Sequence, residues 1–459
     1  MSSKANKIVL DLKFSSSPPT ISDRVIGVAE AFGIGVDETR EVPIFDKIVL
    51  QYNDADLIYV TGDSGSGKSC FLRLFMEHER ARGRKVGSFE TVAVDPEEII
   101  VNGVGRDLGE SLGILSTVGL SEAFMMIRRF KELSDGQKYR YKLAKLIDEG
   151  VDVFVIDEFG AALDRVMAKV LAYSFQKWAR RNNKQLVIAT THHDLIEDFS
   201  PDILVYKPIG KPAQVTYSKP ETKPFSLIRE MTIQQGTMQD YDSLSQFHYL
   251  HGKPMVIRIF KLTWNSQVIG VAVYSLPFLH AAGRSKLFPE YADKQRLNRE
   301  VRRISRVIID PKFRGAGLAA AFISQCNRLM GMRVIESLAV MAKYNPFFVK
   351  AGMAVGGVSK ASREQERVVG FAVAKGFKLW QLRTKAGRKQ FLSSLSSGEF
   401  QKFMACLIKI YRGKRAISKG ADTDIEQLQK GNIDKALADA LPTEKVYLYW
   451  VNPDWRPTQ

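Results

Sequence analysis

The segment LIYVTGDSGSGKSCFLRLF, residues 57 to 75, decides the fold of the first half of the chain. An apolar run ends at Thr61, a glycine-rich loop follows, and an amphipathic stretch begins at Lys68. Strand, loop and helix in this order form a P-loop, whose backbone N–H groups close around a β-phosphate at a helix N-terminus. The expected nucleotide-binding residues are Gly62, Asp63, Ser64, Gly65, Ser66, Gly67, Lys68 and Ser69. We therefore predict an ATP site, with Lys68 on the β- and γ-phosphates and the Ser69 hydroxyl on Mg²⁺.

A second apolar run, VFVI at 153 to 156, ends in two acidic residues. Asp157 is the expected second residue of the Mg²⁺ shell, and Glu158 is expected to polarise the attacking water. Apolar runs at 57 to 61, 153 to 157 and 186 to 190 alternate with amphipathic stretches. This alternation predicts an α/β fold with a parallel sheet.

Three further motifs follow in the order found in ABC-type ATPases, which residues 20 to 205 resemble. LSDGQ at 133 to 137 is similar to their LSGGQ signature, AALD at 161 to 164 to their D-loop, and HHD at 192 to 194 to their switch histidine. The resemblance implies that Ser134, Gly136 and Gln137 contact the nucleotide bound by another subunit. One chain carries one P-loop and one signature, so a head-to-tail homodimer is the implied active form. The implied switch histidine is His193, with His192 as the alternative.

Two departures from that family stand out. No glutamine occurs between Gln51 and Gln137, so the family's Q-loop residue is absent, and VDPEEI at 94 to 99 is the candidate to take its role. Ser134 lies only 66 residues after Lys68, which leaves a short helical subdomain without the usual surface for membrane subunits. We therefore expect no membrane subunit.

Positive charge is concentrated in the second half of the chain. The formal net charge is +17; residues 1 to 225 hold 30 basic and 32 acidic side chains, whereas the remainder holds 37 and 18. A domain this basic favours DNA or RNA as a partner. The amino-acid composition, with 45% hydrophobic and 25% charged residues, is that of an ordinary globular protein and excludes a disordered chain. Three scattered cysteines and the lack of a signal peptide predict a cytoplasmic protein, in the host cytoplasm if it is phage-encoded.

The Pro/Lys-rich stretch 207 to 227 has no apolar periodicity and is expected to be a linker. It separates an ATPase domain, residues 1 to 206, from a basic domain, residues 228 to 459. In the basic domain we expect an antiparallel strand pair that turns at Asn265 and Ser266, and a strand that ends at Asp310. We also expect a helix from about Gly315, a helical insertion near 360 to 440, and a late strand in KVYLYWVNPDW.

A second glycine-rich loop, RGAGLA at 314 to 319, joins that strand to that helix. Outward-pointing amides in such a loop form an anion cradle, to which Arg314 would add charge. About 35 residues after Asp310 comes the segment NPFFVKAGM, which begins at Asn345. The position of the loop and the later aromatic segment favour a pyrophosphate-bearing ligand.

These two segments resemble the GNAT acetyltransferases over about residues 235 to 355. The resemblance implies that acetyl-CoA or a related acyl-CoA binds the residues Ile308, Ile309, Arg314, Gly315, Ala316, Gly317, Leu318, Ala319 and Asn345. The tyrosine that often protonates the leaving thiolate falls at Phe348, which cannot donate a proton, so Tyr344 is the nearest substitute. The general base stays open between Glu300 and His248.

A fused ABC-type ATPase and GNAT domain resembles an archaeal, bacterial and phage group predicted to modify nucleic acids, and the second domain is also similar to phage Mom-like DNA-modifying GNATs. We therefore expect an ATP-hydrolysing N-acyltransferase that modifies a DNA base or an RNA base, tRNA included. Two alternatives stay open. One is a protein or small-amine acetyltransferase with a regulatory ATPase, and the other is a structural nucleic-acid-binding ATPase whose GNAT module is inactive.

Overall fold

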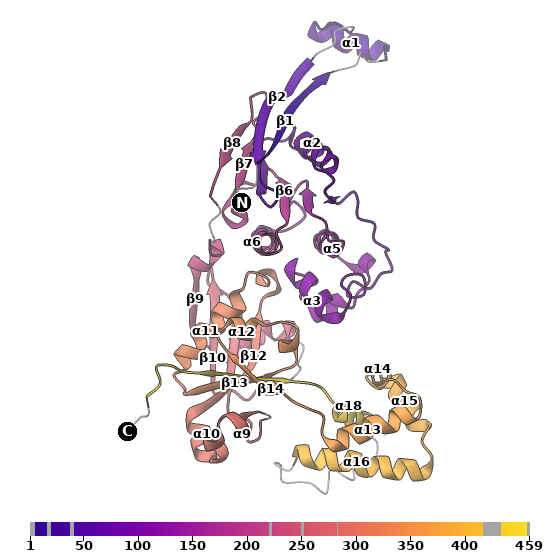
Figure 1. Ribbon diagram of the computed structural model, residues 1–459, viewed down its shortest axis with the longest axis vertical. Coiled ribbons are helices and arrows are strands. Elements are labelled where there is room, and N and C mark those ends of the chain that lie inside the picture. The colour runs from indigo at the N-terminus through magenta and orange to yellow at the C-terminus, as the bar shows by residue number, and fades with distance from the viewer. Residues whose placement is uncertain are drawn as a thin grey trace. The chain divides into compact units, whose positions relative to one another are not determined.

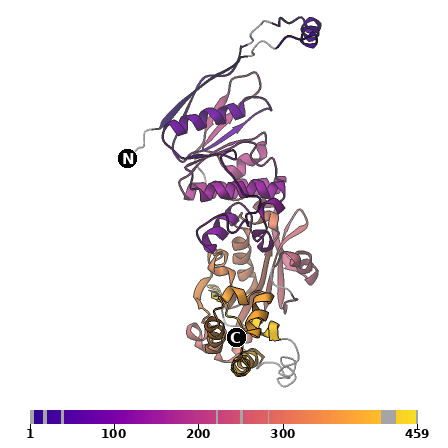
Figure 2. The ribbon, with the colours of Figure 1, turned by 90° about the vertical axis from the view of Figure 1, so that its right-hand side faces the viewer.

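The computed structural model describes residues 5–15, 20–36, 41–219, 223–248, 252–281, 283–415 and 433–456. The chain folds into two compact units (Figures 1 and 2). The first unit contains Met1–Tyr274 and Ser305–Cys326, and the second contains Ser275–Ile304 and Asn327–Gln459. Within the described residues, no helix is both long enough and apolar enough to cross a membrane.

A parallel sheet forms the centre of the first unit. Among the described residues it has six strands in the order β4-β5-β6-β3-β7-β8. Their bounds are β3 Leu57–Thr61, β4 Val86–Gly87, β5 Val153–Ile156, β6 Gln185–Ala189, β7 Ile203–Tyr206 and β8 Gln214–Tyr217. The first five are parallel, and β3, β5 and β6 are buried along their whole length, as expected of strands covered by helices on both faces. The predicted α/β fold with a parallel sheet is therefore confirmed for this unit.

Part of the stretch predicted as a linker is folded. Strand β8 lies inside residues 207 to 227 and pairs antiparallel with β7 at the edge of the sheet. The prediction was wrong for these residues because a short edge strand with three exposed side chains carries almost no apolar signal.

Helices connect the strands of the first unit. They are α2 Lys68–Ala81, α3 Leu108–Thr117, α4 Ala123–Met126, α5 Asp135–Asp148, α6 Arg165–Arg181 and α7 Ile196–Phe199. Helix α2 begins directly after the glycine-rich loop, as the sequence predicts. A long antiparallel hairpin, β1 Asn6–Ser15 and β2 Glu41–Tyr52, carries α1 Asp23–Phe32 at its far end (Figure 2).

A second sheet has the order β14-β15-β13-β12-β11-β10-β9 in the part of the chain that the structure describes. Its strands are β9 Met231–Gly236, β10 Arg258–Trp264, β11 Gln267–Ser275, β12 Val301–Ile309, β13 Val334–Ala339, β14 Ala354–Val358 and β15 Val446–Val451. The antiparallel pair β10 and β11 turns at Asn265 and Ser266, whose φ angles are 46° and 62°. A two-residue turn with both φ angles positive matches the twist of a hairpin, so the predicted strand pair is confirmed. The predicted late strand is confirmed as β15.

Strands β12 and β13 are parallel but pair over a short length. The register runs from Val301 opposite Val334 to Arg303 opposite Glu336. Strand β12 then continues to Ile309, and a turn of 3-10 helix, Pro311–Phe313, leads to the helix α11, Leu318–Met330. The predicted strand and the predicted helix after Gly315 are both confirmed.

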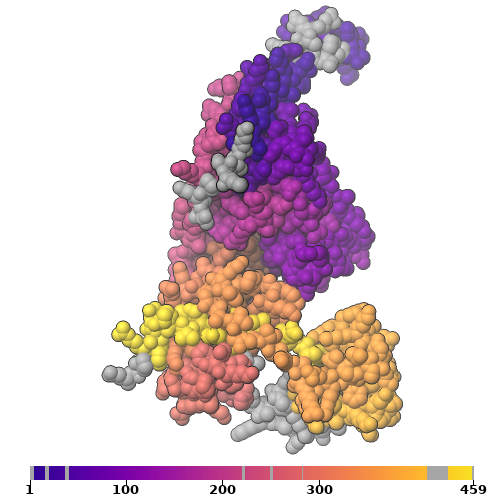
Figure 3. Space-filling view, in the orientation of Figure 1, coloured from indigo at the N-terminus to yellow at the C-terminus, as the bar shows by residue number. Residues whose placement is uncertain are grey.

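The helical insertion forms a body with its own core, orange in Figure 3. Its described helices are α13 Arg363–Ala374, α14 Leu379–Leu382, α15 Lys385–Ser393, α16 Ser397–Arg415 and α18 Ile433–Ala440. Phe391 and Phe403 stack edge to face at its centre and are fully buried. The prediction of a mostly helical segment near 360 to 440 is confirmed for the described part.

A buried ion pair ties three elements of the second unit together. Arg284, at the start of the short helix α9 Arg284–Leu287, donates to both carboxylate oxygens of Glu336 on β13 at 2.8 and 3.0 Å. The Tyr447 hydroxyl on β15 donates to the same carboxylate at 3.1 Å. Burial raises the pKa of Glu336, although Arg284 opposes that shift.

Glu336→Ala is expected to destabilise the protein by about 3–5 kcal/mol, because it leaves the buried Arg284 guanidinium without a counter-charge. Urea unfolding followed by circular dichroism measures the change in the free energy of unfolding. The control is Glu444→Ala, which removes the exposed partner of Lys343 and is expected to cost less than about 1 kcal/mol. Equal losses for the two variants would contradict a structural role for the buried pair.

Candidate functional site

The backbone of the P-loop requires glycine at two positions. Gly62 has φ 145°, and a Cβ there would lie 1.9 Å from the carbonyl oxygen of Lys207. Gly67 has φ 100°, and a Cβ there would lie 2.4 Å from Cγ2 of Ile44. Lys68 reaches back across the loop and donates from Nζ to the carbonyl oxygens of Gly62 at 3.0 Å and Asp63 at 2.7 Å. Lys68 thus spans the loop, and helix α2 begins directly after it, which is the sequence of elements that binds phosphates in a P-loop.

The two predicted Mg²⁺ residues lie on one cavity. Ser69, in the first turn of α2, and Asp157, directly after β5, line a hollow of about 340 Å³. Glu158 follows with φ 49°, a left-handed conformation that costs energy for a residue with a side chain. Its amide donates to Oδ1 of Asp157 at 2.8 Å. A hydroxyl and a carboxylate on one cavity are ligands that Mg²⁺ accepts, and Ser69 directly follows the P-loop in the sequence.

A residue pair that the sequence reasoning missed lines the same cavity. Ser88 and Glu90 follow β4, the strand beside β5. The Ser88 side chain is 7% exposed, and its hydroxyl has no hydrogen-bond partner in the described part of the chain. Because carboxyl ends of neighbouring parallel strands meet at one sheet edge, the position of these residues after a strand was the signal that could have found them.

In the stretch predicted to replace the Q-loop glutamine, two carboxylates form ion pairs with residues of the helical subdomain. Within VDPEEI at 94 to 99, Glu97 pairs with Arg129 at 3.1 Å and with Lys131. Glu98 accepts from the Tyr141 hydroxyl at 2.6 Å and pairs with Lys145 at 3.2 Å. Both carboxylates hold the helical subdomain together, whereas Ser88 and Glu90 line the cavity of Ser69 and Asp157.

The signature segment forms the N-terminus of α5. Ser134 caps this helix: its hydroxyl accepts from the amide of Gln137 at 3.4 Å, and its own amide donates to the Gln137 side chain at 3.0 Å. Gly136 packs closely on the D-loop, since a Cβ there would lie 2.9 Å from the carbonyl oxygen of Ala162. The Ser134 side chain is exposed and therefore accessible to a second molecule.

The two candidate switch histidines differ in their environment. His192 is half-buried, and its carbonyl oxygen accepts from the Tyr59 hydroxyl. Burial lowers the pKa of His192, and the nearby Arg165 lowers it further. His193 is exposed, begins a short 3-10 turn, His193–Leu195, and lies against Tyr206 with ring centroids 6.0 Å apart.

A P-loop, an acidic pair after a buried strand, and a capped signature helix define a nucleotide-binding protein of the P-loop class. No protein-family profile matches the chain. The chain is 30% identical over 179 residues to the cytochrome c biogenesis ATP-binding export protein CcmA of Colwellia psychrerythraea. This match covers 33% of this chain and 80% of that protein. It is 26% identical over 178 residues to the CcmA protein of Pseudomonas aeruginosa, which covers 33% of this chain and 87% of that protein. The chain belongs to the ABC-type ATPases, with an ATPase domain over about a third of its length in the N-terminal part.

Solved structures with a similar arrangement include a dimeric ATP-binding cassette bound to ADP and phosphate. It is 18% identical, has a TM-score of 0.32, and is matched over 39% of this chain and 92% of its own. A second dimeric cassette, from a bacterial ABC transporter, is 17% identical with a TM-score of 0.32 and is matched over the same shares.

The second glycine-rich loop presents free amides. Gly315 and Gly317 have φ angles of 106° and 81°. In the described part of the chain, the amides of residues 315 to 319 donate to no other group, and they precede or begin the 13-residue helix α11. Successive free amides at a helix N-terminus form a site for an anion such as a pyrophosphate.

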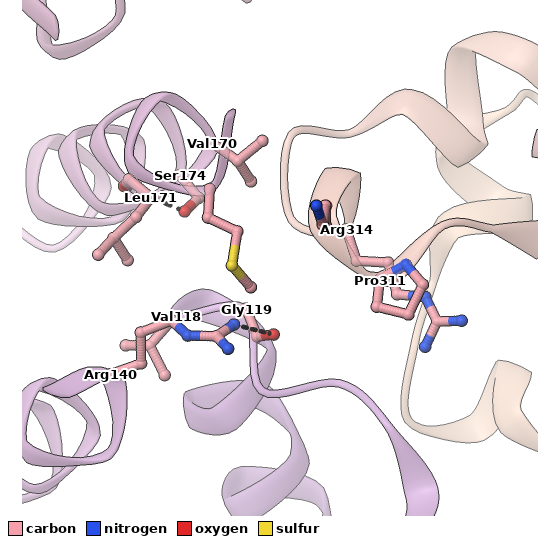
Figure 4. A pocket seen from close by; sticks show the side chains of 10 residues that line it. Val118, Gly119, Arg140, Val170, Leu171, Ser174, Pro311 and Arg314 are labelled. Carbon is pink, nitrogen blue, oxygen red and sulfur yellow. Dashed lines mark hydrogen bonds between the residues drawn. The ribbon is translucent and has the colours of Figure 1, made fainter. Parts of the chain in front are cut away.

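The structure corrects the role predicted for Arg314. Its guanidinium donates to the carbonyl oxygens of Ile309 at 2.8 Å, Phe247 at 3.3 Å and Ser121 at 3.4 Å, all within the first unit. Burial lowers the pKa of Arg314. Figure 4 shows Arg314 and Pro311 on one side of a pocket of only about 10 Å³. Arg314 thus braces the loop through three backbone carbonyl oxygens.

The other predicted acyl-CoA residues lie as follows. Ile308 and Ile309 are buried at the end of β12 in the first unit. Asn345 is exposed and Tyr344 half-buried in the second unit, where they follow the 3-10 turn Met341–Lys343. Phe348, at the position of the usual tyrosine, is 5% exposed and packs on Phe347 with ring centroids 4.0 Å apart.

The two candidate bases have different surroundings. Burial raises the pKa of Glu300, but hydrogen bonds from Arg333 and Arg296, both 3.0 Å long, outweigh it and hold the pKa below its usual range. A carboxylate held by two guanidinium groups is a weak base, which favours a structural role for Glu300. His248 is half-buried and follows Phe247, whose carbonyl accepts from Arg314. Glu300 is thus held in an ion-pair network, and His248 follows a residue that contacts Arg314.

Proposed function

We propose that this protein uses ATP hydrolysis to drive the transfer of an acyl group from acetyl-CoA, or a related acyl-CoA, to an amino group of a DNA or RNA base. The observation that carries the proposal is a second anion cradle, residues 315 to 319, in a chain that also holds an ABC-type ATPase site. The ATPase would occupy residues 1 to 206 and the transferase residues 228 to 459, with the protein located in the cytoplasm.

On the ATPase side, the amides of the P-loop and Lys68 would bind the phosphates, and Ser69 and Asp157 would hold Mg²⁺. The bound ion would supply positive charge to the phosphates. Glu158 would accept a proton from the attacking water, with His193 beside it. Ser134, Gly136 and Gln137 would contact the nucleotide of the second chain in a head-to-tail homodimer.

Ser88 and Glu90 are two further residues that we assign to the ATPase site. Their position on the cavity of Ser69 and Asp157 supports a role in orienting the Mg²⁺ shell. We expect Glu90→Ala to lower kcat for ATP hydrolysis by about 10- to 100-fold while the Kd for ATP changes little. Removal of a residue that orients the ligands of a metal ion typically has an effect of this size. Phosphate release and nucleotide titration measure the two quantities.

The matched control for Glu90→Ala is Glu97→Ala, which removes the same charge from a carboxylate that pairs with Arg129 and Lys131 instead. Glu97→Ala should leave kcat within about threefold of the wild-type value. If both variants lose the same activity, Glu90 has no special role at the cavity.

On the transferase side, the amides of residues 315 to 319 would bind the pyrophosphate of the acyl-CoA, and Asn345 would contact its pantetheine arm. The amino nitrogen of the base attacks the thioester carbonyl, so a C–N bond forms and the C–S bond breaks. The proton lost by the nitrogen goes to a base, for which His248 is the candidate, and the thiolate gains a proton from Tyr344 to leave as CoA thiol. Ile308 and Ile309 exclude water beside the thioester.

The acceptor class follows from charge and access. The excess of basic residues after position 225 favours a polyanion, and no transfer to a base inside a duplex is possible without extrusion or single-stranded substrate. ATP hydrolysis offers the energy for that extrusion.

The test is to incubate the protein with Mg-ATP, acetyl-CoA and, separately, DNA, total tRNA and a protein extract. Mass spectrometry of the digested nucleosides and peptides then locates any added acetyl group. We expect an acetylated nucleoside. Acetylated peptides would favour a protein acetyltransferase with a regulatory ATPase, and no product together with no binding of acetyl-CoA would favour a structural ATPase.

A further inference from the structure

The helical body of the second unit carries an unusual surface charge. Residues 360 to 415 and 433 to 440 contain 15 lysines and arginines but only five acidic residues. Two of the basic groups are neutralised by ion pairs, Lys375 with Glu399 at 2.9 Å and Arg388 with Asp434 at 2.8 Å. We call α13, α14, α15, α16 and α18 the basic helical module.

The module is rigid enough to present a defined surface. Its buried apolar side chains form one core that draws on all five helices. These side chains are Val368, Ala372, Leu382, Phe391, Phe403, Leu407, Ile410, Ala436, Leu437, Ala440 and Leu441. A contiguous core of this kind fixes the helices against one another, so exposed side chains on them keep their relative positions.

The corner between α14 and α15 is held especially tightly. A Cβ at Gly387 would lie 2.1 Å from the carbonyl oxygen of Gln381, so only glycine lets the two helices approach this closely. The buried Arg388 donates to the carbonyl oxygens of Leu382 and Arg383, both at 3.1 Å, and to the carboxylate of Asp434 on α18. The corner is thereby locked to the rest of the module.

This corner displays a large aromatic side chain. Trp380 on α14 is 65% exposed, whereas none of the other four tryptophans, all of them within the described residues, is among the exposed residues. Exposed lysines surround it in the sequence: Lys378 precedes α14, and Lys385 and Lys389 lie one turn apart on α15. An exposed indole is a flat aromatic face on which an unpaired base can stack.

We propose that the basic helical module binds single-stranded nucleic acid, with a base stacked on Trp380 and phosphates near Lys378, Lys385 and Lys389. Stacking on an aromatic ring requires an unpaired base, and the exposed lysines that flank Trp380 in the sequence fit the phosphates on either side of that base. This inference rests on the proposed function, because it names the surface that holds the strand whose base is acylated.

The experiment measures fluorescence anisotropy of a fluorescein-labelled oligothymidylate, and separately an oligouridylate, of about 20 nucleotides with the full-length protein over a range of salt. Replacing all three lysines, K378E/K385E/K389E, should weaken binding at least tenfold. It should also reduce the slope of log K against log salt by about 2, because about 0.7 is lost per phosphate contact on a single strand. Trp380→Ala should weaken binding by roughly 5- to 100-fold, and Trp380→Phe, which keeps a stacking ring, by less than about threefold.

The matched control is K7E/K286E/K294E, which makes the same change of charge at exposed lysines outside the module. It should lower affinity much less and leave the salt slope near the wild-type value. ATP hydrolysis and the thermal unfolding of all variants should match the wild type, which separates binding from folding.

Three outcomes overturn the inference while the proposed function stands. If both triple variants weaken binding equally, the module is no special site, and if Trp380→Ala binds like the wild type, stacking is excluded. Preference for duplex over single-stranded probe would likewise overturn it. A wild-type protein that binds neither probe at low salt contradicts the proposed function itself.

Discussion

A Glu158→Gln protein is expected to bind ATP normally, to hydrolyse it at least about 100-fold more slowly, and to accumulate as an ATP-bound dimer. The amide of glutamine has almost the shape of the carboxylate but cannot accept a proton, and loss of a general base costs roughly 10²- to 10⁴-fold. The left-handed backbone at this position, φ 49°, is equally strained for both residues, so the exchange tests chemistry and not conformation.

Phosphate release measures the rate of hydrolysis for the Glu158→Gln protein, and light scattering behind a sizing column, with and without Mg-ATP, measures the mass of the particle. The matched control is Glu149→Gln at the exposed end of α5, which should hydrolyse ATP like the wild type. Normal hydrolysis by Glu158→Gln would remove Glu158 from the mechanism. A slow variant that stays monomeric with ATP would instead contradict the head-to-tail dimer.

Gly317→Glu is expected to abolish acetyl-CoA binding, with a loss of affinity of at least about 100-fold. The substitution places a carboxylate within the free amides of residues 315 to 319, where it would repel a pyrophosphate and take its hydrogen-bond donors. No atom lies within 4 Å of a Cβ at Gly317, so the new side chain meets open space. Isothermal titration calorimetry with acetyl-CoA measures the affinity.

The control for Gly317→Glu is Gly317→Asn, because asparagine tolerates the positive φ of 81° better than most residues and adds no charge. It should retain binding within about tenfold, and both variants should keep ATP hydrolysis. If Gly317→Glu binds acetyl-CoA as the wild type does, the loop is not the pyrophosphate site. Equal loss in both variants would indicate damage to the backbone.

The features that sequence reasoning predicted well are local ones. The P-loop, the acidic pair after β5 and the signature helix each occupy a few consecutive residues, and their order places them on known elements. The turn at Asn265 and Ser266 is local in the same sense. Such features need only the backbone preferences of neighbouring residues.

The features that sequence reasoning missed depend on tertiary contacts. Ser88 and Glu90 join the nucleotide cavity only because β4 lies beside β5, although about 65 residues separate the two strands in the sequence. The Arg314 guanidinium donates to three carbonyl oxygens, those of Ser121, Phe247 and Ile309, of which two are distant in the sequence. A local sequence pattern does not predict a tertiary contact with a residue that is distant in the sequence.

The central claim is that ATP hydrolysis and acyl transfer to nucleic acid belong to one catalytic cycle. The most direct test follows radiolabel from acetyl-CoA into polymer that nucleases, but not proteases, can release, with Mg-ATP and without it. We predict that label appears with wild-type protein and Mg-ATP and falls by at least about tenfold when ATP is omitted or Glu158→Gln protein is used. Label that is independent of ATP, or that only proteases release, would contradict the claim.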